Sequence, residues 1–542
     1  MNFYLQNIIG GGTATGPQWS VLKHNGPMFP SLYVPHKTEI LVKGKLEVLP
    51  ELAEEYGTMF AKYIGTPYME ASNFKKNFWV DFKPTVKELN VQSLDDFDFT
   101  NYKNYLTIER EKRLALNKSK EDKDKVKEKE KEVEEPYRNC IIDGVQQKIG
   151  NFKIEPPGIF VGRGKHPKLG RIKKRVRPED VIINIDKEAK IPFPNVPGEW
   201  GGVIHERSVI WLATWKEEIT GKNKYVFTSL DSFFKSKSDE AKFDLARDLK
   251  KKANAIREKY ESELEDANNK KRQLATALYF IDNLSLRVGG KKDTKDEADT
   301  VGVTSLRVEH LTFLENNTIK LDFLGKDSVR YCKKVNVIES VYNNLKDFVK
   351  DKNKKDDLFD LINSSSINSY LDSFLEGLTA KVWRTYNASL LFQKELDRIK
   401  EERLEGMDDN ERLNFLISMF NQANTTVALL CNHQKNVNKN LDEGVEKIEE
   451  RIKELRKKKN KYQNNKEKLN KIEIKIKLYK LKKDTKLKMK NVSLSTSKNN
   501  YIDPRIIFTF IKKFDVPPEK LFNQQLIERF KWASEVDKEW RF

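Results

Sequence analysis

The stretch at residues 495–506, "STSKNNYIDPRI", predicts a polar segment that leads directly into a helix. Serine, threonine and asparagine side chains compete with the backbone for hydrogen bonds, so we expect a loop before residue 501. Asp503 followed by Pro504 favours a helix start, with Asp503 as the N-cap and Pro504 at the first helical position. Tyr501 is therefore expected in a loop just before a helix N-terminus, where free backbone N–H groups favour a phosphate.

A lysine-rich segment, residues 445–490, precedes this stretch and holds 19 Lys or Arg against 7 Asp or Glu. Its apolar residues recur at coiled-coil spacing in two halves, which the polar residues 463–465 separate. We therefore predict an antiparallel helical hairpin that forms an arm rather than a globular domain.

The chain as a whole is long and strongly basic. Its 542 residues suggest roughly three or four domains, and 101 Lys or Arg against 82 Asp or Glu give a net charge of +19. Such a charge favours a polyanionic partner, either nucleic acid or an anionic membrane. Because no apolar run approaches the ~18 residues of a membrane span, we expect nucleic acid and no membrane. Cys140, Cys332 and Cys431 lie too far apart for a disulfide framework or zinc site, which favours a reducing compartment.

Composition divides the chain into a mixed first part and a mainly helical second part. Residues 1–16 are glycine-rich without periodicity and are interpreted as a leader or a disordered segment. Short apolar stretches within residues 19–80 suggest strands. Residues 104–135 are rich in charge and poor in apolar faces, which predicts an exposed helix or helix pair.

Two helices and a β-hairpin are predicted after residue 231. Apolar residues recur at helical spacing over residues 245–264 and again over 274–284, and Gly289 and Gly290 are expected to end the second helix. Residues 318–335, "TIKLDFLGKDSVRYCKKV", alternate apolar and polar side chains on both sides of a turn. This pattern predicts a β-hairpin with Lys326 at its tip.

Five polar residues of the second part stand at the edges of expected elements: Arg287, Lys326, Arg384, His433 and Tyr501. Each also suits a structural role, as an ion-pair partner, a solvated turn lysine, a helix-end histidine or a surface tyrosine. Together they fit the attack of a tyrosine hydroxyl on a phosphodiester. That reaction needs cationic donors at the non-bridging oxygens and an acid for the leaving oxygen.

Several long stretches, in the same order, resemble the eukaryotic type IB DNA topoisomerases. The first half contains "NFKIEPPGIFVGRGKHPKLG". The second half contains "YFIDNLSLRVGG", "EADTVGVTSLRVEH", "LDFLGKDSVRYCKKV", "LTAKVWRTYNASLL", "ALLCNHQK" and "STSKNNYIDPRI". The resemblance covers nearly everything from Gly16 on, and the pattern SKxNYxDPR is its sharpest motif.

The resemblance implies a role for each of the five residues. Tyr501 is the nucleophile, Arg287, Arg384 and His433 bind the non-bridging oxygens, and Lys326 protonates the departing 5′ oxygen. The implied activity is relaxation of positive and negative supercoils through transient single-strand cleavage, a 3′-phosphotyrosine intermediate, strand rotation and religation. No cofactor or metal is expected, and the sequence has no G-x-x-x-x-G-K-[ST] loop for ATP.

Further positions match residues that contact DNA in the family: Arg163, Thr300, Asp327, Ser328, Lys381 and Asn500. Of these, Arg163, Asp327 and Asn500 also match the pocket of camptothecin-type inhibitors at the cleaved DNA interface. The expected partner is duplex DNA, bound by a monomer in the nucleus during replication and transcription.

The implied fold is a multidomain α+β clamp around duplex DNA, mainly helical in its catalytic half. Its parts are an N-terminal DNA-binding cap at residues 17–230, a catalytic core at 231–435, a coiled-coil linker hairpin at 436–490 and a C-terminal domain with the tyrosine at 491–542.

Two other functions compete with this interpretation. A tyrosine recombinase would use the same type of chemistry, and recombination of a defined pair of sites would identify it. An architectural DNA-binding protein without catalysis would form no covalent adduct with DNA.

Overall fold

The computed structural model describes residues 17–116, 120–434, 441–462 and 465–542, so the predicted leader, residues 1–16, lies outside the described residues. The described residues divide into two compact units. The first contains residues 17–235 with Lys292–Asp299, and the second contains Ser236–Lys291 with Thr300–Phe542.

The first unit combines short strands with helices around two apolar cores. Its helices are α2 (Glu51–Ala61), α3 (Ser72–Phe82), α4 (Thr100–Leu116) and α5 (Lys120–Arg138). Its strands are β1 (Leu22–His24), β2 (Ile40–Val42), β3 (Lys45–Glu47), β4 (Phe97–Asp98), β5 (Asn139–Ile142), β6 (Val145–Lys148), β7 (Gly158–Ile159), β8 (Ile172–Lys173), β9 (Val181–Asn184), β10 (Gly202–Ile204), β11 (Ala213–Lys216) and β12 (Asn223–Val226).

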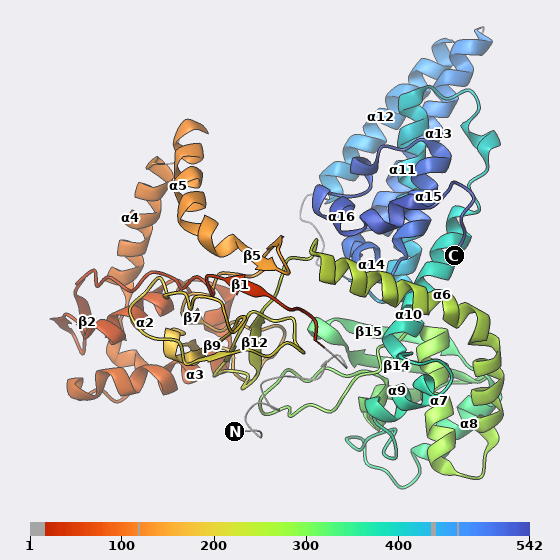
Figure 1. Ribbon diagram of the computed structural model, residues 1–542. Coiled ribbons are helices and arrows are strands. Elements are labelled where there is room, and N and C mark those ends of the chain that lie inside the picture. Colours follow the sequence, from red (N-terminus) through yellow and green to blue (C-terminus); the bar gives the residue numbers. More distant parts are fainter. Residues whose placement is uncertain (1–16, 117–119, 435–440, 463–464) are drawn as a thin grey trace. The chain divides into compact units, whose positions relative to one another are not determined.

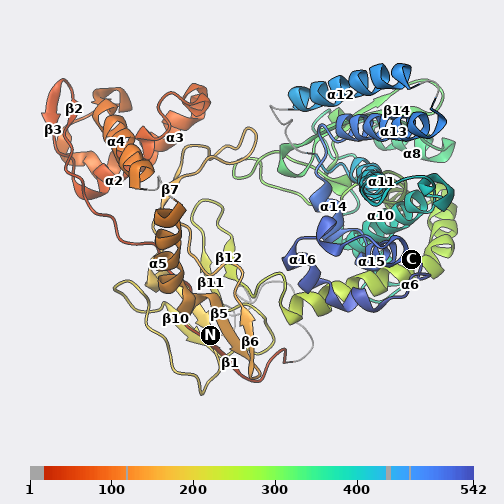
Figure 2. The same ribbon diagram turned by 90° about the horizontal axis from the view of Figure 1, so that it is seen from above.

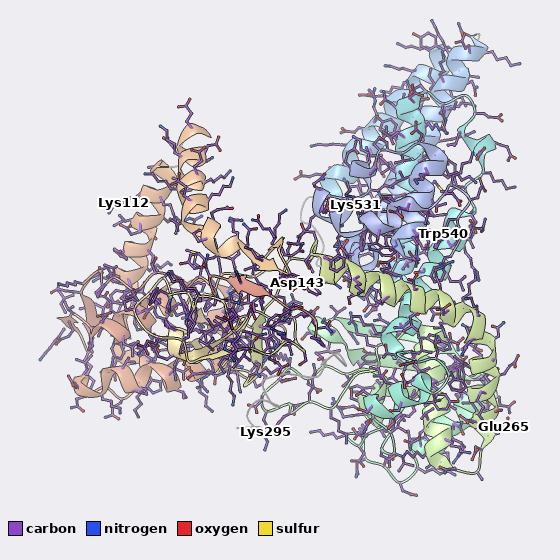
Figure 3. The ribbon with its side chains drawn as sticks, in the orientation of Figure 1. Lys112, Asp143, Glu265, Lys295, Lys531 and Trp540 are labelled. Carbon is purple, nitrogen blue, oxygen red and sulfur yellow. The ribbon has the colours of Figure 1, made fainter. Side chains whose placement is uncertain are left out.

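These strands form small sheets with the orders β1-β5-β6, β3-β2-β4, β10-β9-β11-β12 and β7-β8. One core stacks Phe60 on Phe78 and Phe78 on Phe82, and the other surrounds Trp19 and Val181. The predicted strands near residue 40 and the charged helix pair, α4 and α5, are confirmed. Figure 3 labels Lys112 on α4, and this exposed lysine pairs with Glu109, three residues earlier on the same helix.

The second unit is mainly helical and surrounds one extended apolar core. Its helices are α6 (Phe233–Ser262), α7 (Asn269–Leu284), α8 (Glu339–Phe348), α9 (Ser364–Asp372), α10 (Ala380–Leu396), α11 (Asp409–Leu430), α12 (Leu441–Lys461), α13 (Lys466–Lys488), α14 (Leu494–Asn500), α15 (Pro504–Phe514) and α16 (Gln524–Arg529). Its strands are β13 (Leu311–Phe313), β14 (Thr318–Leu324) and β15 (Arg330–Asn336), which pair in that order. Both predicted apolar stripes lie on helices, and the hairpin is confirmed (Figure 1).

Helix α7 ends earlier than its glycines predict. It stops at Leu284, and Ser285 takes a left-handed conformation with φ 49°. Arg287 therefore lies in the following loop rather than on the helix. Gly289 has φ +79°, and a Cβ there would lie 2.6 Å from the Cα of Gly302. The glycine is needed for this close backbone contact and not for the helix end.

The helical hairpin predicted from the lysine-rich segment is confirmed in α12 and α13. Lys459 pairs with Glu473 and Lys483 with Glu449, so the late residues of one helix face the early residues of the other. The hairpin is not a free arm, because α13 packs against α11 within the second unit (Figure 1 and Figure 2). Ile474 is buried in α13.

The loop predicted before Tyr501 is wrong, because residues 494–500 form helix α14. Contacts with the rest of the unit outweigh the weak helix propensity of this serine- and asparagine-rich stretch. Asn424 of α11 donates to the carbonyl of Leu494 over 3.1 Å, and the His433 carbonyl accepts from the Ser493 N–H over 2.9 Å. The predicted start of α15 is confirmed, since the Asp503 side chain accepts from the N–H of Arg505.

Candidate active site

Tyr501 lies in the short turn between α14 and α15 and is only 6% exposed. Its N–H donates to the carbonyl of Ser497 over 2.9 Å. Its own carbonyl accepts from the Ser389 hydroxyl over 3.1 Å, and the same Ser389 oxygen accepts from the Asp503 N–H over 3.0 Å. The Ser497 carbonyl and the Ser389 hydroxyl of α10 thus hold the tyrosine backbone at its N–H and at its carbonyl.

Arg384, on the second turn of α10, contacts Tyr501 directly. Its Nη1 donates to the Tyr501 hydroxyl oxygen over 2.8 Å, and the guanidinium carbon lies 4.8 Å from the ring centroid. Nε donates to the Ser285 carbonyl over 2.7 Å and Nη2 to the Cys431 carbonyl over 3.2 Å. Arg384 is 3% exposed, and these partners within the described residues are neutral. A buried cation with neutral partners creates a strong preference for a bound anion.

His433 follows α11 and lies against the same tyrosine, with ring centroids 5.1 Å apart. Its Nδ1 is 2.7 Å from Ser497 Oγ, while its buried Nε2 has no hydrogen-bond partner among the described residues. Burial, followed by the charges of Arg384 and Arg287, lowers the pKa of His433 to about 3. The imidazole is therefore neutral at physiological pH and has one free nitrogen.

A cavity of about 100 Å³ adjoins these residues. Four of the five predicted catalytic residues line it: Arg287, Lys326, Arg384 and His433. They come from the loop after α7, the β14–β15 turn, α10 and the segment that follows α11. The fifth, Tyr501, reaches the group through its hydrogen bond to Arg384. The fold thus brings together residues that are far apart in the sequence, around a space that suits an oxyanion.

Family models match almost the whole described chain. The model for the DNA binding fragment of eukaryotic DNA topoisomerase I matches residues 17–228, and the model for the catalytic core of the same enzyme matches residues 231–466. A model for a C-terminal topoisomerase domain matches residues 473–542. The chain belongs to the eukaryotic DNA topoisomerase I family.

Individual relatives agree with this assignment. The chain is 41% identical to DNA topoisomerase 1 beta of Arabidopsis thaliana, over 97% of this chain and 59% of the relative. It is 40% identical to DNA topoisomerase 1 of Caenorhabditis elegans, over 96% of this chain and 67% of the relative. It is 38% identical to DNA topoisomerase 1 of Homo sapiens, over 97% of this chain and 72% of the relative. The chain therefore spans about three fifths of the length of the first of these topoisomerases.

Arg287 and Lys326 line the cavity from two different segments of the chain, the loop after α7 and the turn between β14 and β15. The Arg287 carbonyl accepts from the Val303 N–H over 2.9 Å, which ties the loop after α7 to the segment that follows residue 300. Lys326 is exposed at the tip of the hairpin, where Asp327 and Ser328 have φ values of 65° and 58°. Two successive left-handed residues make the tip a tight turn that presents the lysine.

The remaining predicted DNA-contact residues lie in several places. In the second unit, Asp327 and Ser328 flank the hairpin tip, Lys381 is exposed on the first turn of α10, and Asn500 is exposed at the end of α14. Thr300 is buried beside Val301, whose N–H donates to the Leu324 carbonyl. Arg163 is exposed in the first unit, between two glycines with positive φ.

Sequence reasoning missed the residues that hold this site in place. The Ser389 hydroxyl binds the backbone of Tyr501, and the Ser497 hydroxyl binds the ring of His433. Neither serine has a local sequence pattern that distinguishes it from other small polar residues. Asp282, near the end of α7, accepts hydrogen bonds from Arg257, Tyr260 and Trp383. Burial acts to raise the pKa of Asp282, but these donors outweigh it and hold that pKa below its usual range. Asp282 of α7 thereby joins α6 to α10 at Trp383, the residue before Arg384.

Within the described ranges, no group of three or more His, Cys, Asp or Glu side chains is arranged to hold a metal ion. No helix among the described residues is long and apolar enough to cross a membrane.

Proposed function

We propose that the chain relaxes positive and negative supercoils in duplex DNA by cutting one strand transiently, allowing rotation and resealing it, without ATP or metal. The observation that carries this proposal is the buried Arg384 guanidinium, which donates to the Tyr501 hydroxyl over 2.8 Å beside the cationic cavity. A DNA phosphate would supply the negative charge that this buried cation lacks among its hydrogen-bond partners. Membership of the topoisomerase I family supports the same reaction.

In the proposed reaction, the Tyr501 oxygen attacks the scissile phosphorus and its proton leaves to water. The bond from phosphorus to the 5′ bridging oxygen breaks, and Lys326 gives that oxygen a proton. The products are a 3′-phosphotyrosine bond and a free 5′-hydroxyl. Arg287, Arg384 and His433 donate to the non-bridging oxygens and stabilise the charge of the transition state. Because the phosphotyrosine bond conserves the energy of the phosphodiester, resealing is the reverse reaction and needs no nucleotide.

The other parts of the chain have proposed roles around this chemistry. Residues 17–230 act as a DNA-binding cap and residues 231–435 as the catalytic core of a clamp. Residues 436–490 form a linker hairpin, and residues 491–542 a C-terminal domain that carries the tyrosine. Six further residues contact the DNA: Arg163, Thr300, Asp327, Ser328, Lys381 and Asn500. Three of them, Arg163, Asp327 and Asn500, also line the inhibitor pocket at the cleaved DNA. We propose that the protein acts as a monomer in the nucleus and is a target of camptothecin-type inhibitors.

Relaxation of a supercoiled plasmid in EDTA, without ATP, tests this function. Negatively and positively supercoiled plasmids should both relax in steps, and Tyr501→Phe should have no activity in the same buffer. A strict requirement for ATP or magnesium would contradict the proposal. Recombination of a defined pair of sites would instead identify a recombinase.

A further inference from the structure

The contact between His433 and Ser497 joins the candidate active site to helix α14. Ser497 is completely buried, and its Oγ lies 2.7 Å from His433 Nδ1. The histidine backbone is also held, since its N–H donates to the Ala428 carbonyl over 2.8 Å and its carbonyl accepts from the Ser493 N–H over 2.9 Å. The imidazole therefore has a fixed position relative to α14.

A neutral imidazole carries a single N–H, and the hydrogen bond at one ring nitrogen decides which nitrogen carries it. The low pKa of His433 means that its ring is neutral in the folded protein. If Ser497 donates to Nδ1, the proton must lie on Nε2, which is then a donor. If Nδ1 donates to Ser497, Nε2 is an acceptor and would repel an oxyanion.

The surroundings of Nε2 favour the first arrangement. This nitrogen is buried without a partner among the described residues, and His433 lines the cavity together with Arg287 and Arg384. Guanidinium groups offer only donors, so a ligand that satisfies them presents acceptor oxygens. The same ligand can satisfy Nε2 only if Nε2 carries the proton.

We propose that Ser497 is a positioning residue that donates its hydroxyl proton to His433 Nδ1 and thereby holds the Nε2–H tautomer for binding an oxyanion. The identity of that oxyanion as a DNA phosphate rests on the proposed function, whereas the tautomer is a property of the free protein. The Ser497 carbonyl also accepts from the N–H groups of Tyr501 and Ile502, over 2.9 and 3.0 Å. One residue thus orients the histidine and begins the turn that carries the tyrosine.

The tautomer can be measured in the full chain without DNA, by nitrogen NMR after histidine-selective 15N labelling. The chain has six histidines, and the signals missing from His433→Gln identify those of His433. We expect the proton on Nε2 in the parent and a loss of that preference in Ser497→Ala. Ser495→Ala, at an exposed position of the same helix, should leave the tautomer unchanged. A proton on Nδ1 in the parent would overturn the proposal, whether or not the variants fold.

A double-mutant cycle on DNA cleavage gives a second, independent test. Ser497→Ala should slow cleavage roughly tenfold, the factor that one ordinary hydrogen bond provides. In a His433→Gln background the same change should have little effect, because an amide has no tautomer to select. Equal losses in both backgrounds would mean that Ser497 acts only on the structure, and would contradict the proposal. A parent protein without any relaxation activity would contradict the proposed function, while the NMR spectrum would still decide the tautomer.

Discussion

The Arg384 guanidinium and the Tyr501 hydroxyl are hydrogen-bonded over 2.8 Å, although 117 residues separate them in the chain. The contact joins α10 to the turn between α14 and α15, inside one apolar core that contains residues from both. The tyrosine is therefore held beside its cationic neighbours in the described second unit, rather than presented on a loose loop.

Arg384→Ala should reduce the rate of DNA cleavage by about 10²-fold or more, the usual loss when one donor to a transition-state oxyanion is removed. The control is Lys394→Ala, at an exposed position on the same helix, which should cleave at the parent rate. Single-turnover cleavage of a short duplex measures both. Arg384→Lys should recover only a small part of the loss, because a compact ammonium lacks the planar fork that points separate N–H groups at Ser285, Cys431 and Tyr501. A fully active Arg384→Ala variant would remove Arg384 from the mechanism.

Lys326→Ala should slow cleavage by about 10²-fold or more with little loss of DNA affinity, because a general acid acts on the leaving oxygen and not on binding. Lys334→Ala, on β15 of the same hairpin, is the matched control and should cleave normally. A substrate with sulfur at the 5′ bridging position has a leaving group that needs no acid. It should restore the cleavage rate of Lys326→Ala, and a failure to do so would count against the acid role.

The helical hairpin should contact DNA phosphates and slow strand rotation without taking part in the chemistry. Lys457 and Lys458 are exposed on α12, and their joint change to glutamine should leave cleavage intact at low salt. The slope of log affinity against log salt should fall by roughly 0.9 for each lysine that contacts a phosphate. The same double change at Lys346 and Lys350, in and just after α8, should not alter the slope. Loss of cleavage at low salt in the hairpin variant would instead place the hairpin in the catalytic machinery.

Patterns of neighbouring residues in the sequence correctly predicted the helices and turns that depend on those neighbours. The apolar stripes of α6 and α7, the turn that presents Lys326 and the Asp503-Pro504 helix start all depend on neighbouring residues, and all are confirmed. The segment 494–500 was mispredicted as a loop because its helix depends on tertiary contacts. Ser497 and Ser389 were missed for the same reason, since their partners His433 and Tyr501 lie 64 and 112 residues away. The set of five catalytic candidates came from their chemistry and from the family resemblance.

The most direct test of the central claim is to trap the covalent intermediate. The parent protein, mixed with DNA and stopped with denaturant, should carry DNA through a 3′-phosphate on Tyr501, which digestion and mass spectrometry would locate. Tyr501→Phe removes only the nucleophilic oxygen, so it should bind DNA within a few-fold of the parent and form no adduct. An adduct at the DNA 5′ end, or on another residue, would contradict the account.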